Sequence, residues 1–258
     1  MRGLILADLI RLRRTRAFHL ALLGMLVLAA LFMIMQATAM DYKVPLSRVI
    51  FLPVSMYGIT SAAFVSVFIG TDYSDGFIRN KLIVLNKRKY FFFSQIGICS
   101  LACVIIYVAI TIFTTLVGSL FFENNVQLTE FCEYFFLGIC MSITTGCIFS
   151  LISIINGNKA HSIILCMGMA FGMLFLALHT NSILVQEEYK DGILNPHYIS
   201  GIKRVVYEIL HDINPCGQAA QLSTWEVLHP WRIALFNVIF VLFLLIVGCN
   251  LFERKDIY

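Results

Sequence analysis

Residues 17–39 read AFHLALLGMLVLAALFMIMQATA, a run of 23 residues without an Asp, Glu, Lys or Arg. A helix needs about 20 apolar residues to cross the roughly 30 Å hydrocarbon core of a bilayer. The stretch therefore predicts a transmembrane helix. The basic region before it runs from Arg2 to Arg16 and no clear cleavage site follows, so we expect this helix to be retained and not removed as a signal peptide.

Five more apolar stretches of similar length follow the first one. The chain is 59% apolar and only 13% charged, about half the usual charged share, and its mean hydropathy is +0.85. Helices satisfy their own backbone hydrogen bonds in lipid, which favours helical spans. The sequence predicts an all-α integral membrane protein with one transmembrane domain, residues 1–258. Its six spans are expected at about 17–39, 50–70, 91–122, 131–155, 162–180 and 232–252.

Basic residues are unevenly divided between the two sides of these spans. With alternating span directions, 13 Lys and Arg residues fall on one side and 6 on the other. Basic residues next to transmembrane helices accumulate in the cytoplasm. We therefore expect a multi-pass protein of the cell membrane with both termini, the 71–90 loop and the 156–161 loop in the cytoplasm. The 181–231 stretch is then expected outside.

The segment before the first span combines Leu and Ile with a row of arginines, among them Arg11, Arg13 and Arg14. Residues 1–16 therefore predict an amphipathic helix that lies in the cytoplasmic interface of the membrane. The alternative is a basic flank that only sets the topology of the first span.

Two connections between spans are long enough to carry structure. Residues 71–90 hold both charge signs and an apolar patch, a pattern typical of a short surface helix that docks a soluble partner. The alternative is a solvated basic loop. Residues 181–231 predict short helices, one of them around residues 201–211, because loops of this length without structure are uncommon.

Several kinds of site have no counterpart in the sequence. The chain has no G-x-x-x-x-G-K-[ST] phosphate loop, no metal-ligand spacing and no C-x-x-C pair. Its eight cysteines fall mostly in apolar spans, Cys216 alone lying in a polar loop, and are expected to be small packing residues. The span interiors are almost free of ionisable residues, which disfavours an ion-coupled carrier. We expect neither an enzyme nor a directly bound cofactor or metal.

Two stretches resemble the ABC type-2 exporter permease family, the membrane subunits of ATP-binding cassette transporters. The first is TDYSDGFIRNKL, residues 71–82, directly after the second span. Family members commonly have an acidic residue, three variable residues, Gly-Thr and a basic stretch there; Asp72 replaces the usual Glu, and Phe77 the usual Thr. The second is GCNLFERKDI, residues 248–257. The order of the spans and the long loop before the last one agree along the whole chain.

The resemblance implies that residues 71–90 are a coupling helix that seats in a separate ATPase subunit, and that ATP and Mg²⁺ bind to that subunit. It also implies a second permease protomer, identical or related, and external helices that cap the pathway. Asp72, Asp75 and Arg79 are then expected as charged contacts to the ATPase, Gly76 as a turn residue, and Phe77 and Ile78 as apolar anchors.

The expected function is the permease subunit of an ATP-driven exporter. An interior without fixed charge suits a hydrophobic or amphipathic substrate, such as a lipid, a drug or an antimicrobial peptide of the bacteriocin kind. The lipid bilayer and ABC ATPase subunits are the expected partners, with no nucleic acid. Two alternatives are a non-transporting membrane scaffold or immunity protein, and an ion-coupled secondary carrier.

Overall fold

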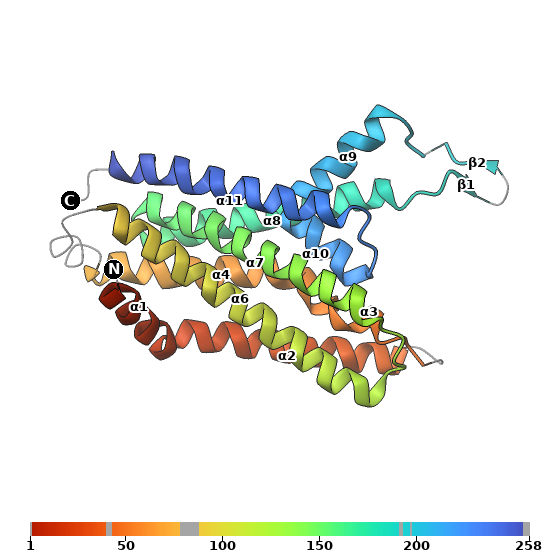
Figure 1. The fold of residues 1–258 in the computed structure, drawn as a ribbon, viewed down its shortest axis with the longest axis horizontal. Helices are drawn as coiled ribbons and strands as arrows, with labels where there is room; N and C mark the ends of the chain where they lie inside the picture. Colours follow the sequence, from red (N-terminus) through yellow and green to blue (C-terminus); the bar gives the residue numbers. More distant parts are fainter. Residues whose placement is uncertain (1, 40–42, 78–87, 191–192, 197, 255–258) are drawn as a thin grey trace.

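The computed structural model describes residues 2–39, 43–77, 88–190, 193–196 and 198–254, and is a bundle of long helices (Figure 1). Within these residues, six helical segments are long and apolar enough to cross a membrane. This confirms the predicted helical fold with six candidate spans. The segments are α2 (Arg16–Ala39), the composite α3–η1–α4 (Ser47–Ser74), α6 (Arg88–Phe121), α7 (Leu128–Asn156), α8 (Lys159–Leu184) and α11 (Pro230–Glu253).

The second span is a composite of three helical pieces, and it departs from its predicted bounds of 50–70 by three residues at the start and four at the end, as much as α8 departs from 162–180. It consists of α3 (Ser47–Ile50), the 3₁₀ helix η1 (Leu52–Met56) and α4 (Tyr57–Ser74). Pro53 near the start of η1 lacks a backbone N–H, which favours a break at this point. At its other end the helix continues four residues beyond the apolar run, because the polar side chains there find partners within the bundle.

The remaining elements are short. Helix α1 (Arg2–Arg14) agrees with the helix predicted within residues 1–16, and α9 (Ile202–Ile213) with the one predicted near residues 201–211. Helix α10 (Pro215–Thr224) and the two-residue strands β1 (Tyr189–Lys190) and β2 (Ile193–Leu194), which pair in antiparallel fashion, were not individually predicted.

The two ends of the bundle differ in what they carry (Figure 1). Helix α1, the last turn of α4, the first turn of α6 and the last turn of α11 lie at one end, called here the terminal end. Helices α3, α9 and α10 lie at the opposite end; the consecutive helices α9 and α10 are called here the α9–α10 hairpin, and this end the hairpin end. The described start of α1 and end of α11 lie at the same end of the bundle, which agrees with an even number of spans.

The helices are buried to very different degrees. In their most apolar windows, 67% of the second span and of α7 is buried, against 22% of α2 and of α8. Close helix contacts depend on small residues: a Cβ added at Gly146 of α7 would lie 2.7 Å from the Cα of Ser100 in α6. The second span and α7 therefore form the centre, while α2 and α8 leave broad apolar faces for lipid or for another protein.

Candidate functional site

Helix α1 is fastened to the terminal end of the bundle by polar side chains. Its inward face carries Asp8 and Leu12, which are buried, and Arg11, which is partly buried. Its outward face exposes the apolar side chains of Leu6 and Ile10. Polar contacts, together with the buried Leu12, give α1 a defined position relative to the helices that it contacts.

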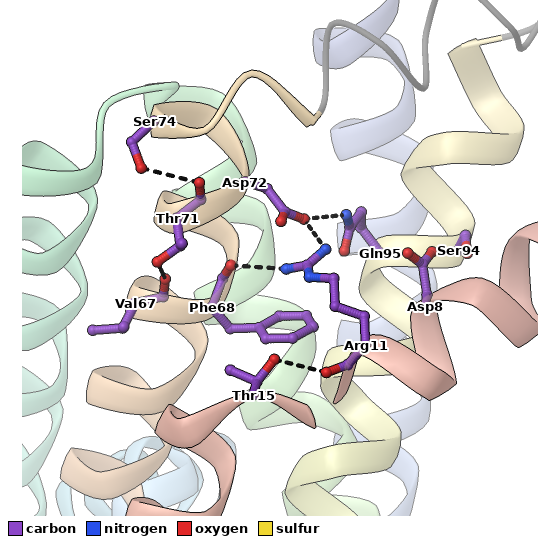
Figure 2. A network of polar contacts seen from close by, with 10 residues as sticks. All are labelled: Asp8, Arg11, Thr15, Val67, Phe68, Thr71, Asp72, Ser74, Ser94 and Gln95. Carbon is purple, nitrogen blue, oxygen red and sulfur yellow. Dashed lines mark hydrogen bonds and ion pairs between the residues drawn. The ribbon is translucent and has the colours of Figure 1, made fainter. Parts of the chain in front are cut away.

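Arg11 is the central group of this contact (Figure 2). Its Nη1 forms an ion pair with Oδ2 of Asp72 in α4, and its Nη2 donates a hydrogen bond to the carbonyl oxygen of Phe68 at 3.1 Å. The guanidinium also lies over the Phe68 ring, 4.1 Å from its centroid. Gln95 of α6 donates from Nε2 to the same Asp72 oxygen at 2.9 Å. One carboxylate therefore joins α1, α4 and α6.

A second contact attaches α1 directly to α6. Ser94 Oγ donates a hydrogen bond to Oδ2 of Asp8 at 2.8 Å, and both side chains are buried. On the other side of α4, the Tyr73 hydroxyl donates to the carbonyl oxygen of Ile154 in α7 at 2.6 Å. The last turn of α4 is thus bonded to α1, α6 and α7, and a displacement of this turn must move these neighbours or break buried hydrogen bonds.

Asp72 requires a correction to the sequence-based interpretation. We expected its carboxylate to contact an ATPase, but only 1% of Asp72 is exposed and the carboxylate faces Arg11 and Gln95. The physical reason is that an unpaired charge at the end of an apolar helix costs free energy. The ion pair with Arg11 on α1 removes this cost. In this structure Asp72 organises the terminal end from within and presents no surface to a partner.

The residues that follow Asp72 are the ones that reach the surface. Asp75 and Phe77 are exposed, Phe77 by 50%. Gly76 has φ 70°, a left-handed conformation that favours glycine and turns the chain away from α4. Ile78 and Arg79, together with the rest of residues 78–87 of the predicted coupling helix, lie outside the described residues. Arg13 and Arg14 are exposed on α1.

The second stretch of the family resemblance packs against the start of α6. Phe252 is buried and stacks on Phe91 and Phe92, with ring centroids 5.8 and 5.9 Å apart. A Cβ added at Gly248 would lie 2.7 Å from the Phe92 ring, so the glycine permits this approach. Lys89 Nζ lies 3.3 Å from Oε1 of Glu253. The second stretch thus meets the start of α6, which is far from it in sequence, at the terminal end.

No family model matches this chain, and no curated protein matches it. In the part of the chain that the structure describes, no three His, Cys, Asp or Glu residues are placed to hold a metal ion. All eight cysteines are free, and six of them are buried. Cys216 is among the buried ones because α10 folds into the bundle, which corrects its expected place in a polar loop.

Sequence reasoning missed the pairing of α1 with α4. It assigned Arg11 to the membrane interface and Asp72 to a partner, although the two types of charge suit each other. The available signal was that Asp72 lies two residues after the end of an apolar run, where a carboxylate needs a partner. The identity of that partner depends on how α1 packs against α4. The local sequence pattern does not give this packing.

Proposed function

We propose that the chain is the membrane-spanning permease subunit of an ATP-driven exporter whose ATPase is a separate polypeptide. The observation that carries this proposal is the convergence of three segments at the terminal end. These are the fastened helix α1, the exposed residues Asp75 to Phe77 after α4, and the end of α11 against the start of α6. Within this set, the family resemblance assigns the contact with an ATPase to residues 71–90.

The proposed mechanism uses the buried contacts as mechanical connections. An ATPase that moves on binding ATP displaces the segment after α4. Because the last turn of α4 is bonded to Arg11, Gln95 and the Ile154 carbonyl, the displacement is passed to α1, α6 and α7 together. The helices then shift as rigid bodies, as packed helices do in other transitions. Asp72 and Arg11 act here as positioning residues.

A hydrophobic or amphipathic substrate is supported by a groove between α2 and α6. The groove has a volume of about 380 Å³ and is lined almost entirely by apolar side chains, including Met33, Ile34, Phe113 and Val117. Its single hydroxyl, that of Thr38, is bonded to backbone carbonyls of its own helix. Lipid, drug and peptide substrates all have the apolar surface that such a groove accepts.

A second protomer is supported by the exposed face of α8. Gly168 and Gly172 lie four residues apart on this face, and a Cβ added at either would meet no atom within 4 Å. Glycines at this spacing allow two membrane helices to approach closely. Replacing Gly168 by Ile should lower the dimer fraction measured by chemical cross-linking in membranes. Unchanged dimerisation would exclude this face as the contact.

The proposal is tested by purifying the tagged chain from its native membranes in mild detergent. We expect an ATPase chain with a phosphate loop to co-purify in fixed ratio, and D75N/F77A to lower that ratio several-fold. The matched control is E226Q/L228A, an exposed acidic and an exposed apolar residue at the same spacing at the hairpin end.

Co-purification that D75N/F77A leaves unchanged would contradict the assignment of this surface. A chain that is fully functional in its cells with no ATPase bound would favour the alternative of a membrane scaffold or immunity protein.

A further inference from the structure

The α9–α10 hairpin is inserted into the hairpin end of the bundle. Helix α10 contacts η1, α7 and α8, and most of its side chains are buried. A Cβ added at Gly58 of α4 would lie 2.9 Å from the Cys216 sulfur, which shows how closely α10 approaches the second span. The hairpin therefore closes this end of the bundle.

A buried carboxylate, that of Asp212, joins the hairpin to the last span. Only 2% of Asp212 is exposed. Its Oδ2 accepts a hydrogen bond from Nε of Arg232 in α11 at 2.6 Å and lies 2.6 Å from Nη2 of the same guanidinium. Within the hairpin, Gln221 Nε2 donates to Oδ1 at 2.8 Å and Gln218 Nε2 donates to the Asp212 carbonyl oxygen at 2.7 Å.

Polar contacts continue from the hairpin into the bundle. Asn237 of α11 donates from Nδ2 to Oε1 of Gln218 at 2.9 Å, and Thr144 of α7 donates to Oδ1 of Asn237 at 2.6 Å. This chain of side chains crosses from α10 through α11 to α7 in surroundings that are otherwise apolar. Such a chain fixes the relative positions of its members, because each broken link leaves a buried polar group without a partner.

Helix α9 is oriented with its charged side toward the protein. Glu208 lies 3.4 Å from Arg204 and 3.7 Å from Arg232, while Ile202 and Val206 on the opposite side are 84% and 49% exposed. Apolar packing therefore does not hold this helix against the bundle. Polar contacts do: His211 Nδ1 lies 2.7 Å from Thr180 Oγ1 of α8, and among the charged contacts Asp212 with Arg232 is the most deeply buried.

We propose that Asp212 and Arg232 form a latch that fastens the α9–α10 hairpin to α11. Breaking the pair releases α10 from the hairpin end while the six long helices stay folded. The hairpin is then a separable unit whose closed position depends on this ion pair in addition to the hydrogen bond that Gln218 accepts from Asn237 and the packing of α10. This inference does not rest on the proposed transport function, since it concerns only how the hairpin is held.

Cysteines already present in the chain provide the test. Cys216 reports on α10, Cys99 in α6 is buried and reports on unfolding of the bundle, and Cys132 is exposed and serves as the labelled reference. Burial raises the pKa of Cys216 to about 11, so its reactive thiolate is scarce while the hairpin is closed. The unmodified chain is treated with N-ethylmaleimide in lipid nanodiscs, and each site is followed by peptide mass spectrometry.

In D212N, and likewise in R232Q, we expect Cys216 to react about tenfold faster or more, with Cys99 still protected, since losing one partner strongly destabilises a buried pair. Cys216 in the double variant D212N/R232Q should react no faster than in either single variant, because each single substitution already removes the ion pair. E226Q, an exposed acid just beyond α10, is the control and should leave the rate unchanged. A Cys216 rate in D212N and R232Q equal to that of the wild type would overturn the proposal.

A variant that unfolds as a whole is recognised by fast labelling of Cys99. R232K then decides, because it keeps the positive charge and loses the forked guanidinium that contacts Asp212 through Nε and Nη2 and Glu208 through Nη2. We expect a smaller but measurable gain in Cys216 labelling with Cys99 protected. No gain in R232K would likewise overturn the latch.

Discussion

Removal of the Arg11 guanidinium tests how firmly α1 is held at the terminal end. R11M deletes the ion pair with Asp72, the hydrogen bond to the Phe68 carbonyl and the contact over the Phe68 ring. A hydrogen bond to a charged group contributes about 1.5–3 kcal/mol, and a partly exposed cation–π contact about 0.5–1 kcal/mol. The Arg11 side chain is 23% exposed, so solvent weakens these contacts. We expect R11M to lower the free energy of unfolding by about 2–3 kcal/mol.

The assay is unfolding by SDS in mixed micelles, followed by circular dichroism, with R11M, D72N and the double variant compared. The double variant should lose less than the sum of the single losses, with a coupling energy of about 1 kcal/mol or more. R13M is the matched control, because Arg13 is exposed on the same helix. Its free energy of unfolding should fall by less than about 0.5 kcal/mol. Additive losses in R11M and D72N would refute a direct role for the pair.

Three further predictions concern other parts of the bundle. F252A should lower the free energy of unfolding by about 3 kcal/mol because it empties a buried stack of rings, whereas L251A on the exposed side of α11 should cost far less. G146I should prevent stable folding, since its side chain meets the α6 backbone; normal yield and thermal stability would contradict this. Burial lowers the pKa of His211, an effect that the neighbouring Asp212 partly offsets, so the folded state binds a proton less readily than the unfolded state. Stability should therefore fall as the pH drops below about 6.5, and H211N should reduce this fall in a thermal unfolding series; an unchanged series would exclude His211 as the cause.

The number and extent of the spans could be predicted because hydrophobic length is a local property. Residues 17–39 were predicted within one residue of α2. The second span was predicted less well, since it extends past its apolar run to Ser74, and Asp72 is tolerated there only through a partner on α1. Local composition does not record that partner.

The candidate site was predictable only where it depends on local sequence. The exposed position of Phe77 and the turn at Gly76 follow from residue type and local order. The buried position of Asp72 and the latch at Asp212 depend on contacts between residues 61 and 20 positions apart. Helix α10 was missed because its sequence is neither long nor strongly apolar, and it is buried only through contacts with η1, α7 and α8.

The central claim is that the surface at the terminal end receives an ATPase subunit. The most direct measurement is photo-cross-linking in the native cells from benzoylphenylalanine placed at Phe77, with the same group at Leu228 of the hairpin end as the control. We expect one dominant adduct from position 77, containing a chain with G-x-x-x-x-G-K-[ST], and no such adduct from position 228. Adducts at position 77 to lipid alone, or the same partners from both positions, would contradict the claim.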